Sequence, residues 1–345
     1  MLKLGLMLNY AGRQVSIPMD LVHEVERLGF DSVWVSEAYG SDAVTVATWI
    51  LARTEKIRVG TGIMQMPART PAMAAMTAMS LHQLSEGRFI AGLGASGPQV
   101  VEGWHGVPYG KPITRTKEYV EIMRRIFARD RPVEFQGEVY QLPAQGPNAT
   151  GLGKPLKSIL GAAPEIPIYT ASVTPAGMRA AAEVADGVLP IWMSPEKFDL
   201  LRTSLDEGFA HSGRTLENFD VAPAVRVVMG DDLDECRLPV KREMALYVGG
   251  MGSRKKNFYN DYCRRMGYGD AAREIQECFL GGDREGAARA VPDALVDETA
   301  LVGPEERIRE RAGAWKAAAR RNEVSTVIVS TEQPEVLSIL VDCLL

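Results

Sequence analysis

Short apolar runs rich in β-branched residues alternate with helix-period segments along almost the whole chain, and this alternation constrains the fold more than any other feature. Eight runs predict strands, and helical sequence follows each of them. The predicted strands are 3–8, 32–35, 57–60, 88–93, 166–171, 187–192, 221–229 and 324–329. Eight strand–helix units predict an α/β fold of the (β/α)8 TIM-barrel type. A doubly wound sheet is the alternative, although five to seven strands would suit it better.

Prolines and capping residues mark where several of the helices begin. The predicted helices are 18–28, 42–52, 71–84, 114–128, 175–185, 195–210, 304–320 and 334–344. Thr70, Thr174 and Ser194 precede prolines and are expected to act as N-caps, because proline suits the first helical turn. In a barrel, these helix starts lie beside the face where strands end, which is the face that carries active sites.

Two segments interrupt the alternation. Residues 133–142 resemble a hairpin with Gly137 at its centre, and 143–164 are rich in glycine and proline. Residues 232–298 are mostly helical. We therefore expect one domain over 1–345, with insertions at about 129–164 and, before the last strand–helix unit, 232–298.

Charge and cysteine usage exclude several classes of protein. The chain has 39 basic and 44 acidic residues, a net charge of −5, which argues against a nucleic-acid partner. No run of 18 apolar residues predicts a membrane span, and the N-terminal run has no basic region typical of a signal peptide. The four cysteines form no C-x-x-C pair and no metal-binding pattern, so we expect reduced thiols, no metal and a cytoplasmic protein.

Residues 92–97 match G-x-G-x-x-G, the fingerprint of dinucleotide-binding folds. The context does not fit, because three strand–helix units precede the motif and no strand ends in an acid about 20 residues later. Two other interpretations remain open. The glycines form either a tight turn or a place where the backbone approaches a ligand closely.

Two further strand ends are candidate ligand sites. Residues 170–175 join a strand to a helix start, where free N–H groups and the helix dipole suit a phosphate. A plain capped helix start is the alternative. Residues 60–63 contain two glycines after a strand, which suits either unusual backbone close to a ligand or an ordinary loop.

Taken in order, seven segments resemble the bacterial-luciferase-like superfamily of TIM barrels, and within it the coenzyme F420-dependent oxidoreductases. The segments are 33–37, 60–63, 69–71, 84–89, 92–104, 185–188 and 302–304. Each motif is weak alone, whereas the ordered set covers nearly the full chain.

The resemblance implies that a deazaflavin, coenzyme F420, lies across the mouth of the barrel, backed by a non-prolyl cis peptide at Gly62–Ile63. The implied cofactor-binding residues are Ser36, Glu37, Thr61, Gly62, Ile63, Gly94, Ala95, Ser96, Thr170, Ala171, Ser172, Val173 and Thr174. This chain departs from the family in two places. Ser172-Val173 replaces a frequent glycine pair in the phosphate turn, and Ala38 replaces a histidine that many relatives carry.

The resemblance also implies hydride transfer between F420 and a small organic substrate such as an enone, imine or ketone. Candidate proton donors are Glu37, Glu102, His105 and Tyr109, each of which has a structural role as its alternative. The basic residues between 249 and 256, with Arg264 and Arg265, either hold the coenzyme's anionic tail or form a solvated helix face.

Two other functions remain open at this point. The first is an FMN-dependent monooxygenase on the same barrel, and the second is a binding barrel without a cofactor. Relatives commonly dimerise through outer helices, so a homodimer or higher homo-oligomer is expected.

Overall fold

A parallel β-sheet forms the centre of the protein. The computed structural model describes residues 2–10, 12–254 and 256–345. The strand order is β10-β9-β8-β5-β3-β2-β1-β13-β11-β12, and β4 pairs beside β5. The strands are β1 Lys3–Leu8, β2 Ser32–Val35, β3 Arg58–Thr61, β4 Met64–Gln65, β5 Phe89–Gly94, β8 Ile168–Ala171, β9 Gly187–Leu189, β10 Asp220–Val221, β11 Ala224–Met229, β12 Leu301–Gly303 and β13 Thr326–Ser330.

The sheet curls because residues 220–229 pair with one strand on one side and with another strand on the other. Pro223 separates β10 from β11, since proline has no N–H to give to a ladder. The N–H of Ala224 bonds the Pro190 carbonyl at 3.0 Å, while the Pro223 carbonyl accepts from the N–H of Ile328 at 2.9 Å. The run 220–229 therefore links β9 to β13, an arrangement consistent with the TIM-barrel fold predicted from the sequence.

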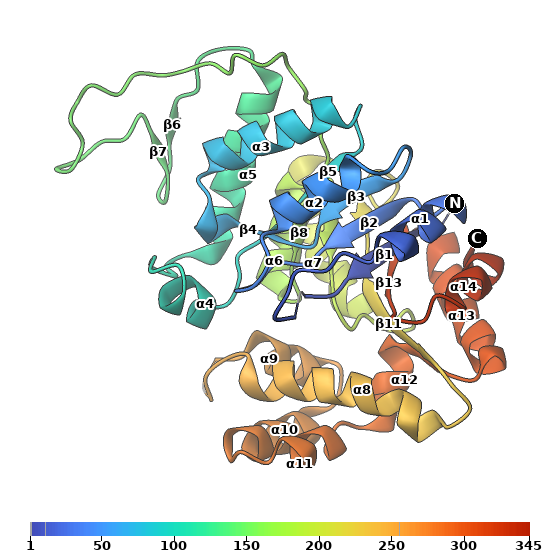
Figure 1. Cartoon of the computed structure of the whole chain (residues 1–345). Helices are drawn as coiled ribbons and strands as arrows, with labels where there is room; N and C mark the ends of the chain where they lie inside the picture. Colours follow the sequence, from blue (N-terminus) through green and yellow to red (C-terminus); the bar gives the residue numbers. More distant parts are fainter. Residues whose placement is uncertain (1, 11, 255) are drawn as a thin grey trace.

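Helices cover the outside of the curled sheet (Figure 1). They are α1 Met19–Arg27, α2 Ala43–Leu51, α3 Pro71–Leu84, α4 Pro98–Gly103, α5 Pro112–Ala128, α6 Pro175–Val184, α7 Asp199–Ser212, α13 Glu305–Arg320 and α14 Val336–Leu344. Thr70 and Thr174 accept hydrogen bonds from N–H groups in the first turns of α3 and α6, as predicted. Within the described ranges, every helix is too short or too polar to cross a bilayer.

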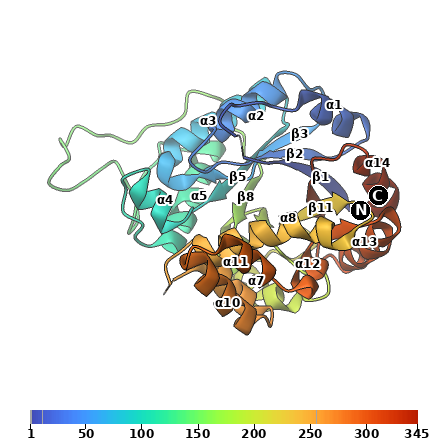
Figure 2. The ribbon, with the colours of Figure 1, turned by 60° about the horizontal axis from the view of Figure 1, so that its bottom comes forward.

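Residues after β11 form a second group of helices, which lies across one end of the sheet (Figure 2). These helices are α8 Leu233–Ala245, the π-helical turn Leu246–Gly250, α9 Phe258–Arg265, α10 Gly269–Leu280, α11 Arg284–Arg289 and α12 Asp293–Thr299. The hydroxyl of Tyr262 bonds the Trp192 carbonyl at 3.4 Å, which ties α9 to the segment after β9. The short strands β6 Phe135–Gln136 and β7 Gln141–Leu142 form the predicted hairpin, and the chain after them extends away from the sheet.

Several predicted boundaries are wrong. Helix α7 begins at Asp199 rather than 195, because residues 194–198 form turns in which the Ser194 hydroxyl bonds Glu196. Strand β9 ends at Leu189 rather than 192, and Trp192 has a positive φ of 50° that no strand accommodates. Helix α5 begins two residues early, at Pro112, and α14 two residues late. The short elements β4, α4 and β12 were not predicted.

Side chains fill the interior of the curled sheet. Trp34, Ile90, Tyr169, Leu189, Ala222 and Ile328 form a buried cluster there. Gly60 makes room for the indole, since a Cβ at Gly60 would lie 2.5 Å from the Trp34 ring. At the end where the strands begin, the Asp220 carboxylate accepts hydrogen bonds from Tyr169 at 2.8 Å and Thr326 at 2.9 Å. A mostly apolar cavity lies at the opposite end, where the strands finish.

Candidate functional site

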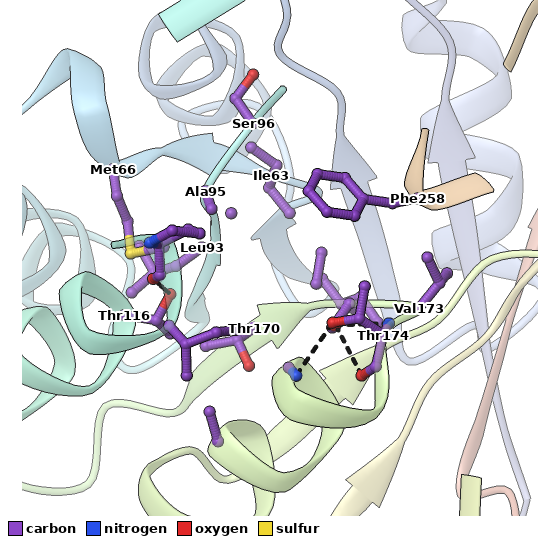
Figure 3. Close-up of a pocket in the computed structure, with 18 of the residues that line it drawn as sticks. Ile63, Met66, Leu93, Ala95, Ser96, Thr116, Thr170, Val173, Thr174 and Phe258 are labelled. Carbon is purple, nitrogen blue, oxygen red and sulfur yellow. Dashed lines mark hydrogen bonds between the residues drawn. The ribbon is translucent and has the colours of Figure 1, made fainter. Parts of the chain in front are cut away.

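A cavity of about 390 Å³ lies where the strands end. Its wall is mostly apolar and comes from the ends of β5, β8 and β9, the starts of α5 and α6, and helix α9. Figure 3 shows Thr170 and Thr174 from the β8–α6 turn, Ile63 from the segment after β3, and Phe258 from α9. An apolar wall with a few polar groups is typical of a small-molecule site.

Two close backbone approaches form the wall beside Ile63. The Gly62–Ile63 peptide bond is cis, as the family resemblance implied. A Cβ at Gly94 would lie 2.6 Å from Cγ1 of Ile63, and a Cβ at Gly92 would lie 1.7 Å from the Thr61 carbonyl oxygen. The first two glycines of the G-x-G-x-x-G motif therefore let β5 approach β3, and a dinucleotide fingerprint is not needed to explain them.

Two of the implied cofactor-binding hydroxyls are engaged within the protein. The Thr61 hydroxyl donates to the Gly92 carbonyl at 2.7 Å and accepts the Gly92 N–H at 3.0 Å. The Ser36 hydroxyl donates to the Leu8 carbonyl at 2.9 Å. Neither side chain lines the cavity, whereas Ser96, which has a positive φ of 59°, does.

The β8–α6 turn forms the opposite part of the wall. Thr174 accepts the N–H of Gly177 at 3.1 Å, and Ser172 accepts the N–H of Thr174 at 3.1 Å. The two hydroxyls also lie 3.3 Å apart. They therefore serve the helix cap, and the buried Thr170 hydroxyl is left without a hydrogen-bond partner among the residues that the structure describes.

Glu37 is not a lining residue of the cavity and lies in a dense set of hydrogen bonds. Its carboxylate accepts the backbone N–H groups of Ala43 at 3.0 Å and Gln65 at 2.7 Å. The Arg69 guanidinium adds two parallel hydrogen bonds of 2.8 and 2.9 Å. Four donors surround the two oxygens, and this arrangement favours a structural role.

The other acid–base candidates lie in different surroundings. His105 bonds the Gln65 side chain at 3.2 Å through Nε2. Glu102 is exposed and accepts the Tyr109 N–H at 3.1 Å. Of the four candidates, Tyr109 alone lines the cavity, and burial raises the pKa of its phenol.

Helix α9 contributes residues that the sequence did not indicate. Phe258 and Tyr259 line the cavity, and Tyr259 packs edge-on against Tyr247 and Trp192, with ring centroids 4.9 and 5.7 Å away. The alternation of strands and helices gives no information about which helix covers a strand end. Trp104 is mostly exposed, while Trp192 is buried in this cluster.

A curled parallel sheet with an apolar cavity at its strand ends defines an α/β protein that binds a small molecule at the carboxyl ends of its strands. The chain belongs to the luciferase-like monooxygenase family, whose model matches residues 6–321.

Known proteins agree with this assignment. The chain is 43% identical to a Mycobacterium tuberculosis protein that is provisionally named a coenzyme F420-dependent oxidoreductase, over 99% of each chain. It shares its fold with the F420-dependent tetrahydromethanopterin reductase of Methanopyrus kandleri, at a TM-score of 0.77 and 23% identity, over 99% of this chain and 98% of that one. An F420-dependent secondary alcohol dehydrogenase matches with a TM-score of 0.72 and 20% identity, over the same shares of each chain.

Proposed function

We propose that the protein is an oxidoreductase that uses coenzyme F420 to transfer a hydride to or from a small organic substrate, an enone, imine or ketone. The observation that carries this proposal is the 43% identity over 99% of the chain with the Mycobacterium tuberculosis relative. The relative's name suggests the coenzyme, and the cavity beside the cis peptide gives a place for it.

The residues around the cavity fit a deazaflavin with a phosphate. Ile63, Gly94, Ala95 and Ser96 would contact the ring system, since these residues line the cavity where its wall is largely apolar. Thr170 supports this fit, because its buried hydroxyl has no partner within the described part of the chain and a bound polar group would supply one. Ala171, Ser172, Val173 and Thr174 would hold the phosphate, through the start of α6 rather than through their capped hydroxyls.

The bound coenzyme would supply a hydride donor or acceptor that reacts poorly with oxygen. Tyr109 is our candidate for the proton donor, because its phenol lines the cavity and its raised pKa keeps it protonated at neutral pH. We assign Glu37 a positioning role, since its oxygens are occupied by Arg69 and two backbone N–H groups.

A cofactor titration followed by hydride-transfer assays tests the proposal. We expect the purified protein to bind F420 more tightly than FMN, and to oxidise reduced F420 when one of a panel of enones, imines and ketones is added. Tighter binding of FMN, or no binding of either cofactor, would reject the assignment.

An FMN-dependent monooxygenase is the second candidate, because the matching family is described as luciferase-like monooxygenases. Such an enzyme would need a separate flavin reductase and oxygen. Oxygen consumption with reduced FMN and the same substrate panel distinguishes it. Failure to bind either F420 or FMN would favour the third alternative, a binding barrel without a cofactor.

The remaining expectations stay proposals. We infer that the curled sheet is a (β/α)8 barrel in one domain over 1–345, with residues 232–298 as its helical insertion. A homodimer and a cytoplasmic location also stay predictions. Size-exclusion chromatography with light scattering tests the first of these two.

A further inference from the structure

A half-buried arginine lies at the β8–α6 turn without an acidic partner. The guanidinium of Arg265, at the end of α9, donates to the Val173 carbonyl. Its Nε is buried and has no hydrogen-bond partner in the described part of the chain. No carboxylate oxygen of the residues that the structure describes lies within 4.0 Å of it, whereas most buried arginine charges are paired.

A second cation lies near two rings of the cavity wall. The Lys256 ammonium is 5.8 Å from the centre of the Tyr109 ring and 5.9 Å from that of Phe258, and both rings line the cavity. Across residues 2–10, 12–254 and 256–345, Lys256 has no ion-pair partner either. Arg265, which lies 5.3 Å from the centre of the Tyr262 ring, and the exposed Lys256 are therefore two positive charges without a carboxylate partner among the described residues.

The local backbone adds potential of the same sign. Helix α6 spans ten residues, and its N-terminus points its partial positive charge toward the turn that carries Val173. In the same wall, the Thr170 side chain is more than nine-tenths buried, and its hydroxyl has no hydrogen-bond partner in residues 2–10, 12–254 and 256–345. Burial lowers the pKa of Arg265, although Tyr262 and Asp261 offset part of this desolvation. A helix start, two cations and an unpartnered hydroxyl together form a site that is suited to bind an anion.

We propose that Arg265, assisted by Lys256, binds the phosphate group of the molecule that occupies the cavity, and so makes the site selective for a phosphorylated ring compound over its unphosphorylated form. The inference rests on the proposed function only for the assumption that the bound molecule contains a ring system. It also explains how Ser172-Val173 is tolerated at the turn. The hydroxyls there are engaged in the helix cap, and the charge for the phosphate comes from α9.

Arg265→Gln tests this assignment, with Arg264→Gln as the matched control. Arg264 is the neighbouring residue of α9, is exposed and bonds only Asn260, at 2.7 Å, so the control removes the same charge away from the turn. Affinities would be measured by fluorescence titration for two pairs of probes. These are FMN with riboflavin, and F420 with the deazaflavin that lacks its phosphate and tail.

We expect Arg265→Gln to weaken binding of the phosphorylated probe by about tenfold, the loss of one charge-assisted hydrogen bond, and to leave the unphosphorylated probe unchanged. Arg265→Lys should recover part of the loss, and the salt dependence of binding should become shallower in Arg265→Gln. Equal losses for both members of a pair, or an unchanged preference for the phosphorylated member, would overturn the inference.

Measuring the melting temperature with and without inorganic phosphate distinguishes failure of this inference from failure of the proposed function. If F420 fails to bind but phosphate raises the melting temperature only when Arg265 is present, the anion site stands and the F420 assignment fails. If F420 binds equally well to wild type and to a folded Arg265→Gln, the F420 assignment stands and the role of Arg265 fails. Arg265→Lys provides the readout if the glutamine variant does not fold.

Discussion

The Arg69 guanidinium donates two parallel hydrogen bonds to the carboxylate of Glu37, which lies 32 residues earlier in the chain. This ion pair joins the end of β2 to the start of α3. The same carboxylate accepts backbone N–H groups from both sides of this junction. The segment from β3 to α3 contains the cis peptide beside the cavity, so this ion pair fixes one edge of the site.

Removing the Glu37 charge should therefore cost stability. We expect Glu37→Gln to lower the free energy of unfolding by about 2–4 kcal/mol, because it leaves Arg69 without its buried partner. Urea denaturation measures the change, and the exposed Glu55→Gln is the control. A stable Glu37→Gln that has lost hydride transfer would instead identify Glu37 as the proton donor.

Adding a methyl group at Gly92 or Gly94 should have graded effects. At Gly92 the Cβ would meet backbone, at 1.7 Å, whereas at Gly94 it would meet the Ile63 side chain, at 2.6 Å. We expect Gly92→Ala to fold poorly, and Gly94→Ala to fold with a loss of about 1–3 kcal/mol and weakened ligand binding. Gly97→Ala is the control within the same motif, since its nearest neighbour would be 3.6 Å away. Equal stability of all three variants by thermal melting would contradict this account.

Tyr109→Phe should slow the reaction without unfolding the protein. A positioned proton donor contributes about 10²-fold or more, so a loss of that size in kcat is expected, with F420 affinity unchanged. Because burial raises the phenol's pKa above its usual value of about 10, the wild-type rate should stay level to about pH 9 and fall only at higher pH. The variant should lack this alkaline fall. Tyr39→Phe, at an exposed position, should behave as wild type, and a Tyr109→Phe enzyme with full activity would exclude the role.

Asp220, at the other end of the strands, should matter for stability alone. Asp220→Ala removes the acceptor of two buried hydroxyls, Tyr169 and Thr326, and we expect a loss of about 2–3 kcal/mol in urea denaturation. Activity per folded molecule should be unchanged, because the interior cluster separates Asp220 from the cavity. The exposed Glu217→Ala serves as control. A changed substrate preference in Asp220→Ala would show that the two ends of the sheet communicate.

Local patterns predicted the strands well, because each depends on a short apolar run bounded by turn residues. All eight predicted runs correspond to strands of the sheet, and Thr70 and Thr174 act as the expected caps. Elements of two to six residues, such as β4, β12 and α4, escaped prediction, since their apolar contacts come from distant parts of the chain.

The site was predictable only where a motif lay in one strand–helix turn. Residues 94–96 and 170–174, which the resemblance implied as cofactor-binding residues, line the cavity. The partner of Glu37, by contrast, lies 32 residues away, and Phe258, Tyr259 and Arg265 reach the site from a helix whose docking depends on Trp192 and Tyr262. Periodicity within a segment gives no information on such contacts between segments.

Helix α9 supplies part of the cavity wall through Phe258, and its Arg265 donates a hydrogen bond to Val173 of the β8–α6 turn. Ligand binding in the cavity and docking of the second group of helices, α8 to α12, are thus thermodynamically linked. Each bound ligand adds contacts that exist only while α9 is docked. Helices α8 to α12 should consequently exchange their amide hydrogens more slowly when the cavity is saturated with ligand, so hydrogen exchange in these helices reports ligand binding.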